Sequence, residues 1–461
     1  MKINDISFKL KKFSHESYLI LKLGFPLVIS QLLMTMIEFV DSIMVGNISS
    51  VDLAALAIAL AIYHPVFLLI LGILIPLSSI VAQFFGSRNF KEIVNNVIQS
   101  FWLSQIFAFF SIMFLSNVDN FLYKFGYQQE VIRITTDYLK ALCWGIPPLC
   151  AFLVLRLFAE GLSITRPTMY FAIIGLILKV FLNYILMFGG YGCPSLGTIG
   201  AGWATSITQW IMLFMIFIFF IKSQLFIKFR KLFLFRKPAW SYFKELLKIG
   251  MPHGLGIAAE TGLFTAVSLI IGTFGVTAVA GHQIAMNIAS LTFMIPMGIS
   301  IAISIRVGLA IGKCNFKDAK YIGRIGILIC VSIMTISSLV FMLIPEKIVK
   351  IYTDDPNLNH QAVKLIYMAA IFQISDGMQV SALGALRGLK DTRIPFITNV
   401  FSYWLIGLPS AYIFGIHFNI GPVGMWIGLI IGLSIAALLH TWRFNILSKR
   451  LSSRSNKTIN N

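Results

Sequence analysis

The sequence predicts an all-α integral membrane protein, with twelve transmembrane helices in two six-helix lobes that a parallel pseudo-twofold repeat relates. Three observations support this fold class: long apolar segments, basic residues gathered in alternate connections, and a repeat of about half the chain. Of the 461 residues, 57% are hydrophobic and only 12% are charged. Ordinary globular domains carry roughly a quarter charged residues, so the composition excludes a soluble globular protein.

The apolar segments are long enough to cross a bilayer, which takes about 20 apolar residues. One of them reads DLAALAIALAIYHPVFLLILGILIPLSSIVAQFFG, and another reads AGWATSITQWIMLFMIFIFFI. In chain order, the predicted spans are 18–46, 53–85, 93–116, 131–158, 167–189, 196–221, 242–273, 277–309, 321–345, 360–386, 394–415 and 422–446.

The net charge of +19 is spread in a way that sets membrane topology. Most Lys and Arg residues fall in the two tails, 1–17 and 447–461, in the long connection 222–241, or in alternate short connections and the adjoining ends of the spans. Cytoplasmic connections of membrane proteins collect positive charge in this way. We therefore expect a multi-pass membrane protein with both termini in the cytoplasm and no nucleic-acid partner.

An internal repeat organises the chain. GSRNFKE begins at Gly86 and GKCNFKD begins at Gly312, 226 residues later, and the same offset relates Pro26 to Pro252. The repeat predicts an N-lobe at 18–221 and a C-lobe at 242–446. Each lobe has an even number of spans, so both start on the same side of the membrane, and the repeat is parallel. Two such bundles can open a cleft to each side alternately, which is typical of transporters.

Two acidic residues fall in the middle of predicted C-lobe spans, where ionisable side chains are costly and usually face a cavity or a partner. Glu260 lies in AAETGLF and Asp376 in ISDGMQV, and the repeat duplicates neither. Carboxylates at similar depth repel each other, which favours the uptake of a proton or a cation. With Gln283 and Asn287, one turn apart, they would offer Na+ several oxygen ligands.

The N-lobe has a different set of charges. Glu38 and Asp41 lie three residues apart in IEFVDSIMVG, and Lys179 and Asn183 lie one turn apart in GLILKVFLNYILMFG. Lys179 is too far from either end of its span to reach water easily, so it needs an acidic partner. We expect Asp41 to face a cavity and either Asp41 or Glu38 to pair with Lys179.

Several stretches resemble the multidrug and toxic compound extrusion (MATE) family, in its NorM-like branch. They are FPLVISQLLMTMIEFVDSIMVG, HQIAMNIASLTFMIPMGISIAISIRVG and LRGLKDTRIP, and the resemblance covers residues 18 to 447. It implies twelve helices in two lobes, a position in the inner membrane of a bacterial cell, and the export of organic cations in exchange for Na+ or H+.

The resemblance also implies roles for individual residues. Asp41 matches the family's N-lobe acid and Asn183 an amide beside it, while Glu260 and Asp376 match the C-lobe carboxylates implicated in cation binding. Three more residues align with positions near the substrate cavity: Gln283, Asn287 and Asp355. Asp355 precedes a proline in a predicted outer connection, where a solvated loop acid is equally expected.

Two positions depart from the family pattern. Lys179 stands where NorM-like sequences usually carry asparagine, and Glu38 stands where a small residue is common. A tethered ammonium beside Asp41 would take the place of a bound cation. This departure predicts that ion coupling rests on Glu260 and Asp376, while Lys179 reshapes the substrate side of the N-lobe.

The sequence thus predicts a secondary-active multidrug efflux antiporter that works as a monomer on small cationic substrates. We expect no cofactor beyond the coupling ion, because the sequence contains no Walker loop and no metal motif. A flippase for lipid-linked precursors, or an exporter of a specialised metabolite, is the alternative on the same architecture. A flippase would need several basic residues in its cavity, and an integral-membrane enzyme would need a catalytic cluster that the sequence lacks.

Overall fold

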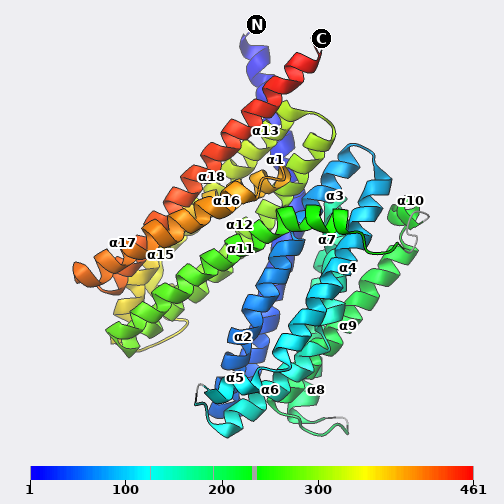
Figure 1. Cartoon of the computed structure of the whole chain (residues 1–461). Helices are drawn as coiled ribbons and strands as arrows, with labels where there is room; N and C mark the ends of the chain where they lie inside the picture. The colour runs from blue at the N-terminus through cyan, green and yellow to red at the C-terminus, as the bar shows by residue number, and fades with distance from the viewer. Residues whose placement is uncertain (1, 125, 191, 231–235, 460–461) are drawn as a thin grey trace. The chain divides into compact units, whose positions relative to one another are not determined.

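A computed structural model describes residues 2–124, 126–190, 192–230 and 236–459 of the chain, and every regular element in them is a helix (Figure 1). Packing divides the chain into two compact units. The N-unit contains Leu32–Gly254, and the C-unit contains the residues up to Gln31 together with those from Leu255 on. Helices α1 (Lys2–Gly46) and α11 (Trp240–Ile271) therefore each contribute their two ends to different units.

The N-unit is built around a core to which helices from Val45 to Phe229 contribute buried side chains. Besides its parts of α1 and α11, it contains α2 (Ser50–Leu74), α3 (Pro76–Gly86), α4 (Phe90–Leu115), α5 (Asp119–Lys124), α6 (Gln129–Cys143), α7 (Ile146–Gly161), α8 (Arg166–Phe188), α9 (Thr198–Lys222), η1 (Gln224–Phe226) and α10 (Ile227–Arg230).

The C-unit has two main clusters of buried apolar side chains, one of which includes Ile20 of α1. Its further elements are η2 (Gly272–Phe274), α12 (Val276–Gly312), α13 (Phe316–Leu343), α14 (Pro345–Val349), α15 (Pro356–Gly388), α16 (Arg393–Val400), η3 (Phe401–Gly407), α17 (Leu408–Tyr412), η4 (Ile413–His417) and α18 (Pro422–Ile459). Two of them, η3 and η4, are π-helical.

The predicted spans correspond to helices of the structure. Among the described residues, ten helices or continuous helix pairs are long and apolar enough to cross a membrane, and the bent pair α6–α7 makes an eleventh. The remaining predicted span, 360–386, lies within α15, which has 33 residues but is not apolar enough to count among these eleven. Large apolar side chains on several spans point outward, as membrane lipid requires, for example Phe109, Phe110 and Met113 on α4.

The internal repeat is visible in the backbone of each unit. Arg88 and Cys314, 226 residues apart, both adopt a left-handed conformation, with φ of 58° and 57°. Each is followed by an asparagine, Asn89 or Asn315, whose side-chain oxygen accepts a hydrogen bond from a backbone N–H in the first turn of the next helix. The matched motifs NFKE and NFKD are thus equivalent helix N-caps.

The repeat also preserves a close contact between helices. A Cβ atom on Gly161 would lie 2.7 Å from the backbone oxygen of Ser78, and one on Gly388 would lie 2.8 Å from that of Ser304. Small residues allow membrane helices to approach in this way. The contact holds α7 against α3 in the N-unit and α15 against α12 in the C-unit.

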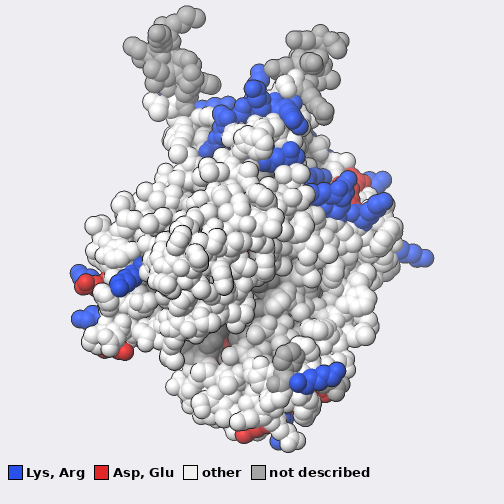
Figure 2. All heavy atoms as spheres, turned by 60° about the vertical axis from the view of Figure 1, so that its left-hand side comes forward, with Lys and Arg blue, Asp and Glu red and all other residues white. Residues whose placement is uncertain are grey.

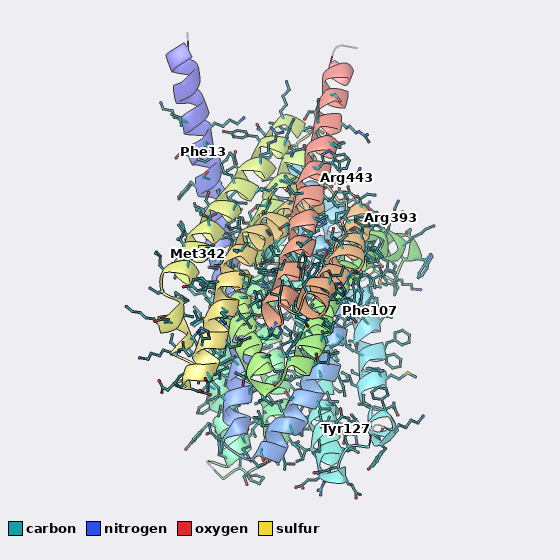
Figure 3. The ribbon with its side chains drawn as sticks, turned by 90° about the vertical axis from the view of Figure 1, so that its left-hand side faces the viewer. Phe13, Phe107, Tyr127, Met342, Arg393 and Arg443 are labelled. Atoms are coloured by element: carbon teal, nitrogen blue, oxygen red, sulfur yellow. The ribbon has the colours of Figure 1, made fainter. Side chains whose placement is uncertain are left out.

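Three arginines that the charge pattern placed in or beside connections lie within helices instead. Arg156 is buried in α7, Arg387 is buried in α15, and Arg306 belongs to α12. Other basic side chains gather at the end of the C-unit where α1 begins and α18 ends (Figure 2). Phe13 of α1 and Arg443 of α18 lie toward this end, and Met342, at the other end of α13, lies further from it (Figure 3).

Candidate functional site

The N-unit contains a buried ion pair between α1 and α8. Lys179 Nζ lies 2.9 Å from Asp41 Oδ1, and the Asn183 amide donates a 2.7 Å hydrogen bond to the same oxygen. Lys179 and Asn183 are completely buried, and Asp41 is 5% exposed. The i, i+4 spacing of Lys179 and Asn183 places both side chains on the face of α8 that meets Asp41.

Helix α9 completes the surroundings of the Lys179 ammonium. The ammonium donates to the backbone oxygen of Ala201 at 3.0 Å and also to the hydroxyl of Thr205. Gly200 allows this approach, because a Cβ there would lie 2.4 Å from the backbone oxygen of Leu186 on α8. An ammonium has three donors, so Asp41, Ala201 and Thr205 satisfy it fully.

Glu38, the other candidate partner of Lys179, has a side chain outside the described part of the structure. Its place in α1 is one turn before Asp41. The geometry therefore identifies Asp41 as a partner of Lys179, and a contribution from Glu38 stays a prediction.

The C-unit brings Glu260 of α11 together with Asp376 of α15. Asp376 is 2% exposed, Glu260 is half-buried, and the two carboxyl groups lie within electrostatic range of each other. The hydroxyl of Tyr403 is close enough to interact with both. Within the described residues, neither carboxyl group forms an ion pair with Lys or Arg.

Gln379 and Tyr403 belong to this site, although the sequence patterns did not single them out. Gln379 lies one turn after Asp376 on the same face of α15, donates a 2.9 Å hydrogen bond to the Tyr403 hydroxyl, and lies within hydrogen-bonding reach of Glu260. The spacing from Asp376 was a usable signal for Gln379. No spacing in the sequence pointed to Tyr403, because it lies in η3, a π-helical segment that departs from the period of an α-helix. Such π-helical segments often occur at functional sites.

The position of η3 is fixed against α11 by Trp404. Its indole N–H donates to the backbone oxygen of Ala259, and a Cβ on Gly262 would lie 2.9 Å from its ring. The absence of a side chain at Gly262 thus lets Trp404 lie against the turn that carries Glu260. This contact brings Tyr403 next to the acidic pair.

The oxygen atoms around the acidic pair are suited to a hard cation. Gln379 is fully buried and its amide oxygen has no hydrogen-bond partner among the described groups, and the same holds for the amide oxygen of Asn399, which is 2% exposed. Asn399 contacts α11 at Gly256, one turn before Glu260. Carboxylate, amide and hydroxyl oxygens are ligands of Na+-like cations as well as proton acceptors. The described part of the chain has no cluster of three His, Cys, Asp or Glu residues that could hold a metal ion.

The other predicted cavity residues form their hydrogen bonds outside this cluster. Gln283 donates a 3.3 Å hydrogen bond to Asn287 on α12, and no hydrogen bond joins either to Glu260 or Asp376 among the described side chains. Asp355 is the N-cap of α15 and accepts from the backbone N–H of Asn357 at 3.0 Å. For Asp355, helix capping is the contact that the structure displays.

Three further buried charged residues went unrecognised in the sequence. Arg156 pairs with Glu160 at 2.7 Å in α7, and the Arg387 guanidinium donates to the hydroxyls of Ser304 and Ser300 at 3.2 and 3.4 Å. Glu160 directly precedes Gly161, and Arg387 directly precedes Gly388, the two glycines of the close helix contact that the repeat preserves. The i, i+4 spacing of Arg156 and Glu160 in an apolar segment was the available signal.

Comparison with known proteins agrees with this architecture. The MatE family profile matches residues 26–185 and 252–413. The chain is 37% identical over 448 residues to the multidrug resistance protein MdtK of Yersinia pseudotuberculosis, covering 96% of this chain and 98% of that protein. The Yersinia enterocolitica MdtK is 37% identical over 451 residues with the same coverage.

Solved structures share the fold. An outward-facing multidrug resistance MATE family transporter matches with a TM-score of 0.86 at 20% identity, covering 95% of this chain and 97% of that one. The eukaryotic MATE transporter AtDTX14 matches with a TM-score of 0.84 at 18% identity, covering 96% and 99%.

Long apolar helices define a multi-pass membrane protein, and the match to the MatE family and to the MdtK multidrug resistance proteins identifies it as a transporter. The chain belongs to the MatE family.

Proposed function

We propose that this chain is a multidrug efflux antiporter of the bacterial inner membrane, which exports small organic cations in exchange for Na+ or H+. The observation that carries the proposal is the pair formed by Glu260 and Asp376, two carboxyl groups side by side in the C-unit without a basic partner among the described residues. The names of the MdtK relatives support the class of substrate.

The acidic pair gives the antiport cycle its coupling site. A cation or proton that enters from outside reduces the repulsion between the two carboxyl groups, and its departure to the inside restores that repulsion. The membrane potential contributes ~2.3 kcal/mol per charge per 100 mV, so one exchanged cation supports a substrate gradient of roughly tens-fold.

Asp41 has a secondary role in this proposal. Its carboxylate already faces the Lys179 ammonium and the Asn183 amide, so it contributes to coupling only through a rearrangement of that pair. The candidate substrate contacts are proposed for each unit by itself. In the N-unit they are Glu38, Lys179 and Asn183, of which the last two become accessible only if the buried pair rearranges. In the C-unit they are Gln283, Asn287 and Asp355.

The positions of the basic side chains bear on the membrane topology. Basic side chains at the end of the C-unit where α1 begins and α18 ends support a cytoplasmic position of both termini (Figure 2).

We propose a monomer, because each unit has its own buried core and the acidic pair lies within one unit. A lipid-linked precursor flippase is less well supported, because the buried Lys179 and Arg156 are each neutralised by a carboxylate.

Ethidium efflux from energised cells tests the proposal. Glu260→Gln and Asp376→Asn should each reduce efflux to the background of cells without the protein, in media with and without Na+ at fixed pH. Glu346→Gln removes an exposed acid of the C-unit and should leave efflux unchanged. Efflux that survives both substitutions, at equal protein levels in the membrane, would contradict the proposed coupling site.

A further inference from the structure

The end of the C-unit where the two termini lie carries two kinds of basic side chain. Some are neutralised by acids: Lys12 pairs with Asp318 at 2.7 Å, Arg443 pairs with Asp391 at 2.7 Å, and Arg306 pairs with Glu16. Each of these pairs joins side chains of two different segments and neutralises both charges. They therefore need no further ligand.

Three other cations at this end lack such partners. Lys320 and Arg324 lie in the first turns of α13, and Lys449 lies near the end of α18. The Lys320 ammonium lies within electrostatic range of the other two cations. No carboxylate pairs with any of the three among the residues that the structure describes. Three like charges held together repel one another, and an anion would relieve that repulsion.

The three cations lie along one seam between antiparallel helices. Ser452 of α18 donates to the backbone oxygen of Phe316, and Arg324 Nε donates to the Asn445 side chain at 2.9 Å. Between these points, a Cβ on Gly323 would lie 2.2 Å from the ring of Phe444. The helices therefore approach closely here and hold the cations beside one another.

Arg324 retains donors for a ligand. Among the described residues, its one hydrogen-bond partner is Asn445, which accepts from Nε, and its side chain is exposed. A guanidinium presents further N–H donors in a planar fork that matches the oxygens of a phosphate group. Lys320 and Lys449 add two point charges on either side of the seam.

The membrane side of the seam is apolar. Leu328, one turn after Arg324 on α13, is 53% exposed, and on α18 Trp442 is 63% and Leu438 61% exposed. Tryptophan is enriched where a membrane protein meets the boundary between lipid headgroups and acyl chains. The seam thus offers cations for a headgroup next to apolar side chains for the chains attached to it.

We propose that the seam between α13 and α18 binds an anionic phospholipid of the surrounding bilayer, with its phosphate on Lys320, Arg324 and Lys449 and its acyl chains against Leu328 and Trp442. The apolar side chains select a lipid over free phosphate, because a soluble anion would leave Leu328 and Trp442 uncovered. This site lies outside the acidic pair and does not depend on the transport activity.

Lipid binding to the purified full-length protein tests this site. Phosphatidylglycerol added to protein in detergent micelles should raise the midpoint of thermal unfolding, and phosphatidylcholine should not. In the triple variant Lys320→Gln/Arg324→Gln/Lys449→Gln the phosphatidylglycerol response should disappear, with an affinity loss of about fivefold for each cation removed. Lys313→Gln removes one exposed cation from the same end and should keep the response.

Two further measurements distinguish the source of the phosphate and exclude misfolding. Inorganic phosphate at the same concentration should not replace the lipid, and Trp442→Ser should weaken the lipid response. The triple variant in phosphatidylcholine should unfold no earlier than the wild type, because the substitutions remove three cations that repel one another in the absence of an anionic lipid. An equal response of the triple variant and the wild type, or an equal response to inorganic phosphate, would overturn the proposal.

Discussion

The N-unit and the C-unit have equivalent backbone features but different buried charges. Asn89 and Asn315 cap equivalent helices, and Gly161 and Gly388 make the same close contact with a neighbouring helix. At the position before these glycines, however, the N-unit has Glu160 and the C-unit has Arg387. The residues that shape the backbone at these positions are repeated, whereas the buried charged residues beside them are not.

The same contrast applies to the candidate sites. In the N-unit, Lys179 neutralises Asp41 from within the protein, while in the C-unit Glu260 and Asp376 face each other with no basic partner in the described chain. The two related units thus contain one buried ion pair and one acidic pair without a basic partner among the described residues. We propose that the first cluster stabilises the fold and that the second exchanges the coupling ion.

The largest expected effect on stability comes from breaking the N-unit pair. Lys179→Ala leaves the Asp41 carboxylate buried without its cation, and should lower the free energy of unfolding by about 3–5 kcal/mol. Thermal unfolding in one detergent measures the change. Lys222→Ala, at an exposed position of the same unit, serves as the control.

Two further variants sharpen this comparison. Lys179→Met combined with Asp41→Leu should recover much of the stability, because no unpaired charge is then buried. Asp376→Asn should cost little, since its carboxyl group has no basic partner to lose. Equal unfolding midpoints for Lys179→Ala and Lys222→Ala would contradict the importance of the buried pair.

An intermediate loss of stability, similar in the two units, is expected at Gly161 and Gly388, which the internal repeat relates. Gly161→Ala and Gly388→Ala each place a methyl group within 2.8 Å of a neighbouring helix. Overpacking of this kind costs about 1–3 kcal/mol, so both variants should unfold earlier by similar amounts. Gly190→Ala and Gly272→Ala, where a Cβ meets nothing within 4 Å, are the controls. A loss at only one of the two glycines would show that the contact is not equivalent in the two units.

The smallest effect is expected at the repeated helix caps. Asn89→Ala and Asn315→Ala each remove one capping hydrogen bond, which is worth about 1 kcal/mol. Asn89→Ser keeps a capping oxygen and should restore most of the loss in thermal unfolding. A neutral Asn89→Ala variant would mean that the backbone of the turn, with Arg88 in its left-handed conformation, is sufficient to start α4.

The sequence predicted the features that depend on local pattern. Apolar length indicated the spans, and the offset of 226 residues indicated the repeat that the caps at Asn89 and Asn315 display. The i, i+4 spacing of Lys179 and Asn183 predicted a shared face of α8, and the cost of a buried ammonium predicted its acidic partner. These inferences succeed because membrane insertion and helix periodicity act on neighbouring residues.

Tertiary structure decided what lies between helices. No pattern in the sequence indicated that α1 and α11 divide their ends between the two packing units, or that Arg387 is buried against Ser300 and Ser304. The π-helical segment that brings Tyr403 to the acidic pair was equally unpredicted. Apolar composition fixes which segments enter the membrane, but lipid solvates every apolar face almost equally. Helix contacts in the membrane therefore depend on close packing and hydrogen bonds between residues far apart in sequence, which only the folded chain brings together.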